Sequence, residues 1–454
     1  MSTALSPEQV GQAAWLEAML ARHACSAYLR GFGSPTTLQE FRDQVPITSH
    51  EALAPWLDRV VAGEPDVLFA GRPCAYELTG GSSGGGKLIP YTVDGLASFQ
   101  SALVPWLAGV VERFPITGSV YLATSPATRP PRLIGDLPLG LPDGAYLGER
   151  WGRWVAEHMA APLDVARETD VAVWRERTLS ALAAARDLEM ISVWSPTFLL
   201  RLLDELPDPR KLWPRLKLVS CWAAAASRGP ADDLRARLPH AHLQPKGLMS
   251  TECVVTVPDA HDQPLLNPNG FFEFERQGGG QGELLLASEL QPGDSSEVIA
   301  TTASGLYRYR TGDLVLCTGH AGAATPVLEF LGRSGITSDL VGEKLIEAFV
   351  QQALADLPGW SFLTVLPGSA GYALVTEVDV PVDLAAVEAR LARNPQYAYA
   401  LALGQLQPLL HRPVARLYDR FVEFRLAQGS RLADIKPIAL MPAARWLDDG
   451  KDPN

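Results

Sequence analysis

Three short and almost uninterrupted apolar runs constrain the fold of this chain more than any other feature. They are S-V-Y-L-A-T at 119–124, M-I-S-V-W at 190–194 and L-K-L-V-S-C-W at 216–222. Strands that are buried on both faces of a parallel sheet have this composition. Helical patterns at 198–206 and 231–238 follow the second and the third run, so strand and helix alternate along this part of the chain. This alternation predicts an α/β fold.

The rest of the chain changes character twice. Residues 253–331 are rich in strand patterns, and two strand patterns at 361–366 and 372–378 then precede a helical pattern at 384–391. We therefore expect a large N-terminal domain over 1–332, with mostly parallel and mixed sheets packed by helices. We expect a small α+β C-terminal domain over 333–454, which is about the usual size of a domain.

Composition excludes several classes of protein. The 454 residues carry a formal net charge of −12 without any block of lysine and arginine, so no nucleic-acid partner is expected. No apolar run approaches the ~18 residues of a membrane span, and the N-terminus lacks the pattern of a secretory signal. The five cysteines are scattered singly. Reduced thiols in a cytoplasmic protein are the simplest interpretation.

A glycine-rich loop, T-G-G-S-S-G-G-G-K at 79–87, points to phosphate binding. Glycines let backbone N–H groups approach phosphate oxygens, hydroxyls add donors, and a lysine supplies a mobile positive charge. Residues 81–87 also match the G-x-x-x-x-G-K pattern of nucleoside triphosphatases. That pattern continues with Ser or Thr and a helix. Here Leu88 follows the lysine, and Pro90 delays any helix to about Val93, which favours a different phosphate loop.

Further motifs follow the loop in a fixed order. They are G-L-M-S-T-E-C (247–253), L-Y-R-Y-R-T-G-D-L (306–314), L-G-R-S-G (331–335), G-E-K-L (342–345) and G-S-R-L-A-D-I-K-P (429–437). The ordered set resembles the adenylate-forming superfamily of acyl-CoA synthetases, luciferases and peptide-synthetase adenylation domains. F-R-D-Q-V-P-I-T (41–48), K-L-I-P-Y-T (87–92) and L-W-P-R-L-K-L-V-S-C-W (212–222) look closer still to the acyl-acid amido synthetases of the Gretchen Hagen family. The resemblance runs from about residue 38 to 440.

The resemblance implies an ATP site with Mg²⁺. Glu252 matches the glutamate that helps to hold the metal, and Asp313 matches the aspartate that accepts hydrogen bonds from the ribose hydroxyls. Arg333 matches an arginine between the two domains that contacts ribose or phosphate. Lys436 matches the mobile lysine of the small domain, so Lys436, Lys87 and Glu252 are the expected catalytic residues. The other implied nucleotide-binding residues are Thr79, Gly80, Ser82, Ser83, Gly84, Gly247, Met249, Ser250 and Thr251.

The same resemblance places the acyl pocket at strand ends, and it also shows where this chain departs from the superfamily. The expected walls are Trp194, Cys221, Trp222, Ala223 and Leu248. The run A-A-A-A at 223–226 fits either room beside a bulky acyl group or tight helix packing. Near Arg333, Gly335 replaces an acidic residue of the general pattern, a departure that fits the amido synthetases better than the CoA ligases.

These observations predict an ATP-dependent ligase. It would activate a carboxylic acid as an acyl-adenylate, release pyrophosphate, and transfer the acyl group to an amine, most simply an amino acid. Two alternatives stay open: a ligase that forms a thioester with CoA or a carrier protein, and a binding protein that kept the fold without the activity.

Overall fold

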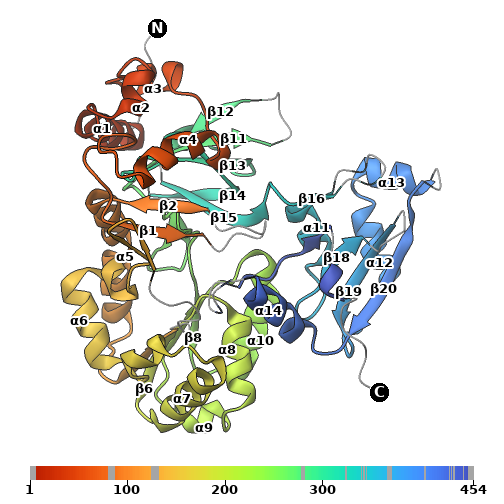
Figure 1. Ribbon diagram of the computed structural model, residues 1–454. Helices are drawn as coiled ribbons and strands as arrows, with labels where there is room; N and C mark the ends of the chain where they lie inside the picture. Colours follow the sequence, from red (N-terminus) through yellow and green to blue (C-terminus); the bar gives the residue numbers. More distant parts are fainter. Residues whose placement is uncertain are drawn as a thin grey trace. The chain divides into compact units, whose positions relative to one another are not determined.

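A computed structural model describes residues 7–79, 87–123, 132–277, 282–322, 325–338, 340, 343, 345–365, 371–402, 405–428, 430, 432, 435–442 and 444–447. The chain forms two compact units. Unit 1 comprises Met1–Tyr121, Pro126–Met190 and Lys246–Glu329, and unit 2 comprises Leu122–Ser125, Ile191–Pro245 and Phe330–Asn454. Helices and sheets alternate in both units (Figure 1), which confirms the α/β prediction.

Unit 1 begins with short helices that pack on a sheet. Phe41 of α3 and Leu53 of α4 share a core with Phe271 of β11, and the N-terminal helices lie over this part of the sheet (Figure 1). Thr37 and Ser49 cap α3 and α4 through their hydroxyls, as residues of this type do at helix starts. The helices are α1 (Pro7–Arg22), α2 (Ala27–Gly31), α3 (Leu38–Gln44), α4 (His50–Val61), α5 (Val93–Arg113), α6 (Gly148–His158) and α7 (Val171–Ala184).

Two sheets belong to unit 1. The smaller has the order β2-β1-β5-β4, and the larger has the order β12-β11-β13-β14-β15-β10-β9. In the larger sheet, β11 pairs antiparallel with β12 and β13, and β13 pairs antiparallel with β14. The strands are β1 (Ala75–Leu78), β2 (Leu88–Tyr91), β4 (Arg132–Ile134), β5 (Leu137–Leu139), β9 (Thr256–Pro258), β10 (Pro264–Leu266), β11 (Phe271–Arg276), β12 (Leu284–Leu286), β13 (Ser295–Thr301), β14 (Tyr309–Ala321) and β15 (Thr325–Arg333).

The three apolar runs form neighbouring strands of one sheet, with the order β3-β6-β7-β8. The sheet belongs to unit 2 apart from the first residues of β3 and β6. Strands β7 and β8 are parallel, and every residue of β7 is buried, as a near-continuous apolar run predicts. The elements are β3 (Ser119–Leu122), β6 (Leu188–Ser192), α8 (Pro196–Asp204), α9 (Pro209–Leu212), β7 (Leu218–Cys221), α10 (Arg228–Arg237) and β8 (His242–Pro245).

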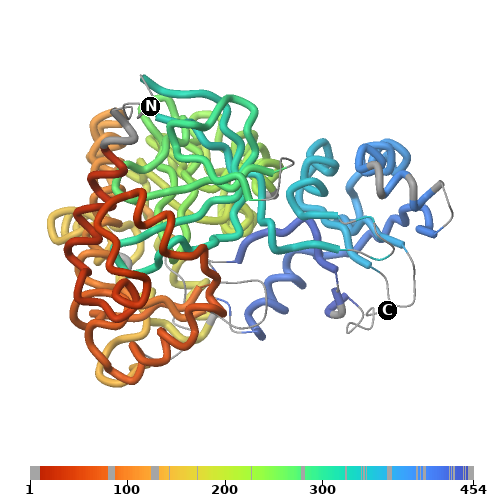
Figure 2. The backbone as a smooth tube through the Cα atoms, turned by 90° about the horizontal axis from the view of Figure 1, so that it is seen from above, coloured from red at the N-terminus to blue at the C-terminus, as the bar shows by residue number. Residues whose placement is uncertain are grey.

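The C-terminal part of unit 2 is a sheet with helices on both faces. Leu363 and Leu374 belong to one apolar cluster and their neighbours Phe362 and Val375 to another, because successive strand residues point to opposite faces. Figure 2 traces this segment in blue. The sheet order is β20-β19-β18-β21. The elements are β16 (Thr337–Ser338), β17 (Leu345–Ile346), α11 (Glu347–Leu354), β18 (Phe362–Val365), β19 (Gly371–Glu377), α12 (Leu384–Leu391), α13 (Pro395–Ala402), β20 (Gln407–Val414), α14 (Leu417–Ala427) and β21 (Leu440–Met441).

Two features bear on the wider predictions. The contact boundary near residue 330 lies close to the expected boundary at 332, while residues 191–245 group with the C-terminal part. The division into domains 1–332 and 333–454 stays a prediction. Across the described residues, every helix is too short or too polar to serve as a membrane span.

Candidate functional site

The glycine-rich loop joins two antiparallel strands. β1 and β2 pair from Ala75 with Tyr91 to Leu78 with Leu88. The pairing continues to the ends of the loop, where the Thr79 N–H donates to the Lys87 carbonyl at 2.9 Å and the Lys87 N–H donates to Thr79 Oγ1 at 3.1 Å. A nucleoside-triphosphatase loop opens directly into a helix. The hairpin therefore contradicts that alternative, and α5 begins only at Val93.

Lys87 lies against Tyr309, the first residue of β14. Its Nζ is 3.5 Å from the Tyr309 hydroxyl and 5.9 Å from the centre of the ring. Tyr309 is fully buried, so its position is fixed by the sheet. The Lys87 side chain is consequently directed from the end of the loop towards the strand that also carries Asp313.

Thr251 and Glu252 occupy the tip of a tight turn. Met249 and Val254 form an antiparallel bridge, and the Ser250 N–H donates to the Cys253 carbonyl at 2.9 Å. No helix begins at this turn, so a helix-capping role for the pair is excluded. Glu252 is 7% exposed. A carboxylate held in a buried turn suits a ligand of fixed position rather than a solvated surface group.

A tyrosine of β2 fastens this turn to the phosphate hairpin. The Tyr91 hydroxyl donates to the Thr251 carbonyl at 2.6 Å, and Tyr91 is 2% exposed. Burial, together with the negative charge of Glu77, raises the pKa of Tyr91 well above its ordinary value, so the hydroxyl keeps its proton and remains a donor. The neighbouring Tyr146 hydroxyl donates to Glu77 Oε1 at 2.9 Å.

Gly247 is required by close packing behind the turn. A Cβ atom at this position would lie 2.0 Å from the Thr256 carbonyl oxygen, well inside any normal contact. The next residue, Leu248, donates its N–H to Thr256 Oγ1 at 2.7 Å. Packing therefore explains the glycine at 247, and its nucleotide-binding role stays a prediction.

Asp313 follows an irregularity in β14. Arg310 pairs with Ile299 of β13, and Leu314 pairs with Glu297. One residue lies between these two partners on β13, but three residues lie between Arg310 and Leu314 on β14, so T-G-D at 311–313 forms a bulge. Gly312 takes a φ of +77°, which favours glycine. Bulges redirect side chains beside functional sites. The bulge gives a physical reason for this tripeptide beyond that of an ordinary turn.

Glu252 and Asp313 act on the same buried thiol. Burial is the main cause that raises the pKa of Cys253, and the negative charges of Glu252 and Asp313 raise it further. Two predicted site residues that are 61 positions apart in the sequence therefore come together in unit 1. Cys253 stays a neutral thiol, which argues against a nucleophilic role.

Arg308 of L-Y-R-Y-R-T-G-D-L connects two sequence motifs within unit 1. Arg308 donates to both oxygens of Glu273, at 2.8 and 3.0 Å, and to the carbonyls of Arg42 and Val45 at 2.8 and 2.7 Å. The Thr48 N–H also donates to the Arg308 carbonyl at 2.9 Å. The early motif F-R-D-Q-V-P-I-T is thereby bound directly to the strand that begins at Tyr309.

In unit 2, the predicted acyl-pocket residues gather at the ends of β6 and β7. The Trp194 and Trp222 rings are 5.8 Å apart, and the Trp222 N–H donates to the Trp194 carbonyl at 2.9 Å. Cys221 is fully buried, while Ala223 is half-buried in the loop that follows β7. The alanine run continues into a short 3-10 helix at Ala225–Ser227.

Lys436 lies over the face of Trp222. Its Nζ is 4.4 Å from the centre of the ring, within the range of a cation–π contact. The predicted mobile lysine and the predicted acyl pocket thus meet inside one compact unit. No local pattern could have shown this contact, and the catalytic role of Lys436 stays a prediction.

The remaining predicted residues are distributed as follows. Leu248 belongs to unit 1, where it packs against the cluster that contains Cys253 and Phe272. Arg333 ends β15 and is half-buried. Four predicted phosphate-binding residues lie outside the described residues: Gly80, Ser82, Ser83 and Gly84.

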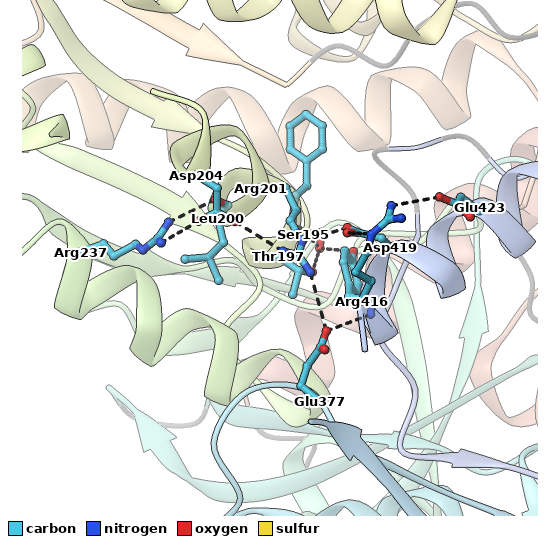
Figure 3. Close-up of polar contacts among 12 residues, drawn as sticks. Ser195, Thr197, Leu200, Arg201, Asp204, Arg237, Glu377, Arg416, Asp419 and Glu423 are labelled. Atoms are coloured by element: carbon cyan, nitrogen blue, oxygen red, sulfur yellow. Dashed lines mark hydrogen bonds and ion pairs between the residues drawn. The ribbon is translucent and has the colours of Figure 1, made fainter. Parts of the chain in front are cut away.

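Sequence reasoning missed three tyrosines. Tyr91 and Tyr309 stand inside the quoted motifs K-L-I-P-Y-T and L-Y-R-Y-R-T-G-D-L, so their place in those motifs was the available signal. Tyr418 had none. Its hydroxyl lies 3.4 Å from Ser195 Oγ across 223 positions of sequence, within a polar cluster around Ser195, Arg201 and Asp419 (Figure 3).

The donor groups of unit 1 fit Mg²⁺ held mainly by phosphate. In the described part of the chain, no group of three or more His, Cys, Asp or Glu side chains could hold a metal by itself. Mg²⁺ commonly takes one or two carboxylates and completes its shell with substrate phosphates and water. The buried carboxylate of Glu252 agrees with that arrangement. The described residues do not fit a metal centre that is built from protein ligands alone.

Comparison with known families decides the classification. Residues 4–208 match the GH3 family N-terminal domain, and residues 264–333 match the GH3 family central domain. The chain belongs to the GH3 family. This GH3 protein is 40% identical over 98 residues to the indole-3-acetic acid-amido synthetase GH3.15 of Arabidopsis thaliana, which is 20% of this chain and 16% of that relative.

Two longer likenesses extend the relationship over the chain. The probable indole-3-acetic acid-amido synthetase GH3.4 of Oryza sativa subsp. japonica is 22% identical over 93% of this chain and 84% of its own length. The solved structure of the AtGH3.15 acyl acid amido synthetase in complex with 2,4-DB has a TM-score of 0.83 at 18% identity, over 98% of this chain and 93% of that chain. A 2-hydroxyisobutyryl-CoA ligase has a TM-score of 0.58 at 15% identity, over 98% of this chain and 94% of that chain. These structures share the fold.

Proposed function

We propose that this GH3 protein is an ATP-dependent ligase that joins a small carboxylic acid to an amine through an acyl-adenylate. The observation that carries the proposal is the phosphate-type hairpin that ends at Lys87 and is tied by Tyr91 to the turn of Glu252. The name of one relative supports an amino acid as the amine, since it is a jasmonoyl–L-amino acid synthetase of Nicotiana attenuata, and two others are named as indole-3-acetic acid-amido synthetases.

Unit 1 supplies the nucleotide site in this proposal. The loop at 79–87 binds the phosphates, and the residues assigned this role from the sequence are Lys87, Thr79, Gly80, Ser82, Ser83 and Gly84. Asp313 accepts hydrogen bonds from the ribose hydroxyls. Gly247, Met249, Ser250 and Thr251 line the nucleotide beside the turn. The ribose or phosphate contact expected of Arg333, a residue of unit 2, stays a prediction.

Glu252 would hold Mg²⁺ between the phosphates. The metal, when bound, offsets the negative charge of the phosphates and of the departing pyrophosphate. Tyr91 keeps the turn in place through the Thr251 carbonyl, and burial keeps water from Glu252. The position of the carboxylate is thus set before the nucleotide arrives.

The acid would occupy the strand ends in unit 2, beside Trp194, Cys221, Trp222 and Ala223. Two indole rings favour an aromatic or apolar acid. A carboxylate oxygen of the acid attacks the α-phosphorus, and the bond to pyrophosphate breaks. Lys436 stabilises the charge that develops in this step. The amine nitrogen then attacks the acyl carbon, loses a proton, and AMP leaves.

Pyrophosphate exchange tests the first half of this reaction. The enzyme is incubated with ATP, labelled pyrophosphate and single members of a panel of aromatic and aliphatic acids, and label in ATP is measured. We expect exchange with at least one acid, and a loss of about 100-fold in Lys436→Ala because a charge-stabilising group is removed. Lys211→Ala is the matched control, since Lys211 is an exposed lysine of α9.

The second half-reaction separates the proposal from its alternatives. Amino acids, other amines and CoA are added in turn with the best acid, and the products are identified by mass spectrometry. An amide supports the proposal, whereas a thioester would assign the chain to thioester-forming ligases. Failure of every acid in the exchange assay would favour a binding protein without activity. Unchanged exchange in Lys436→Ala would remove that residue from the mechanism.

A further inference from the structure

A polar contact joins α8 and α14 in unit 2, the unit that also holds the Lys436–Trp222 pair. Arg201 of α8 is the centre of this contact (Figure 3). Its Nε lies 3.1 Å from Asp419 Oδ1, and its Nη2 lies 3.8 Å from Glu377 Oε1. Asp419 belongs to α14 and Glu377 ends β19, so a single guanidinium reaches two elements of the C-terminal part.

A tyrosine makes the contact specific. Tyr418 is 6% exposed, and its hydroxyl lies 3.4 Å from Ser195 Oγ, which also meets Thr197 Oγ1 at 2.6 Å. The Arg201 guanidinium lies 6.0 Å from the centre of the Tyr418 ring. Burial raises the pKa of Tyr418, so its hydroxyl stays neutral in this contact. Tyr418 therefore contributes a hydrogen bond through its hydroxyl, a ring near the Arg201 guanidinium, and a buried apolar side chain.

The same tyrosine shares its core with the segment that carries the lysine. Tyr418, Phe421 and Ile435 belong to one buried cluster, and Ile435 directly precedes Lys436. On the other side, Ser195 directly follows Trp194, whose ring contacts Trp222. The adjacent residues Trp194 and Ser195 thus contact Trp222 and Tyr418, respectively.

We infer that Arg201 and Tyr418 are positioning residues that seat the C-terminal segment on α8 and thereby hold Lys436 on the Trp222 ring. This inference rests on the proposed role of Lys436 and adds the residues that place it. Arg201 and Tyr418 touch neither the nucleotide nor the acid in this account. Their effect on adenylation passes through Lys436.

The first experiment measures the position of Lys436 without using activity. The full-length protein is acetylated briefly with a water-soluble N-hydroxysuccinimide ester, and modification of Lys436 is quantified by mass spectrometry relative to the exposed Lys211. The Trp222→Leu variant gives the labelling of Lys436 when its side chain no longer contacts an indole ring. We expect Arg201→Ala to raise labelling of Lys436 by about threefold or more. One exposed ion pair changes an equilibrium by up to about fivefold, and Arg201 makes several contacts.

Arg237→Ala is the matched control. Arg237 pairs with Asp204 at 2.6 Å (Figure 3), a carboxylate that also lies 3.5 Å from Arg201 Nη1, and its side-chain exposure of 44% compares with 40% for Arg201. Its ion pair stays between α8 and α10, so labelling of Lys436 should not change. The charge exchange Arg201→Asp with Asp419→Arg should restore protection that Arg201→Asp alone removes.

Adenylation supplies the second readout. We expect Arg201→Ala and Tyr418→Phe to lower the maximal exchange rate with little change in the KM for ATP, and to have no further effect in a Lys436→Ala background. Equal labelling of Lys436 in wild type and Arg201→Ala would overturn the inference, as would full additivity with Lys436→Ala. Increased labelling in a protein that catalyses no exchange would leave the positioning intact and refute the proposed function.

Discussion

The buried ion pair between Arg308 and Glu273 gives a direct test of how the motifs build the fold. Arg308 is 5% exposed and takes a φ of +46°. It makes two bonds to the Glu273 carboxylate and two to main-chain carbonyls of the segment that contains α3. Arg308→Met removes all four bonds while it keeps an apolar stem of similar length.

The expected loss of stability depends on the bonds that the buried Glu273 carboxylate keeps in the variant. Removing one partner of a buried ion pair costs about 3–5 kcal/mol, because the other charge stays buried. Here Arg42 Nε still bonds Glu273 Oε1 at 3.0 Å, which places the expected loss near the lower end, at about 3 kcal/mol. Arg72→Met is the control: its ion pair with Asp136 is exposed, at 47% and 68%, and should contribute less than about 1 kcal/mol.

Urea unfolding measures both variants. The double variant Arg308→Met with Glu273→Leu should recover part of the loss, because the uncompensated carboxylate is removed. Equal unfolding midpoints for Arg308→Met and Arg72→Met would show that the buried pair contributes no more to stability than the exposed one, contrary to this account. A double variant less stable than Arg308→Met would contradict the reasoning about the buried charge.

Three other consequences can be measured separately. Tyr91→Phe loses its bond to the Thr251 carbonyl, and we expect several-fold more Mg²⁺ to be required for half-maximal pyrophosphate exchange, since about 1 kcal/mol is a factor of about five. Gly247→Ala places a Cβ against the Thr256 carbonyl oxygen and should lower the free energy of unfolding by more than about 1 kcal/mol, measured in urea. Burial and Asp66 raise the pKa of the exposed Cys25 thiol, so at pH 8 less of it is thiolate and iodoacetamide should modify it more slowly than a free cysteine.

Each of these has its own control. Tyr76→Phe removes another buried hydroxyl of the same sheet, which bonds the Val60 carbonyl at 3.1 Å, and should leave the Mg²⁺ requirement unchanged. Gly109 has open space at its Cβ position, so Gly109→Ala should not destabilise the protein. Asp66→Asn should speed the alkylation of Cys25. In each of the three assays, a control that shows the larger effect would contradict the role of the contact that the test variant removes or disturbs.

Local sequence patterns predicted most of the elements. The apolar runs at 119–124, 190–194 and 216–222 became β3, β6 and β7, because residues buried on both faces of a sheet must all be apolar. The helix predicted at 384–391 is α12, with the same bounds. The membership of the chain in the GH3 family confirms the resemblance that the ordered motifs indicated.

Contacts between distant segments were beyond a local pattern. The bulge at 311–313 depends on the register of β14 against β13, and the bond of Tyr91 to Thr251 joins residues 160 positions apart. The grouping of residues 191–245 with the C-terminal part also follows from tertiary contacts alone. The motifs indicated Lys436. Arg201 and Tyr418 stand in no motif, so only the contacts in the structure indicated them as positioning residues.

A crystal structure of the protein with bound AMP tests the central claim most directly. The account predicts the ribose hydroxyls within hydrogen-bond distance of the Asp313 carboxylate, and the phosphate at the end of the β1–β2 hairpin near Lys87. AMP bound elsewhere, with Asp313 and Lys87 in contact with protein groups only, would contradict it.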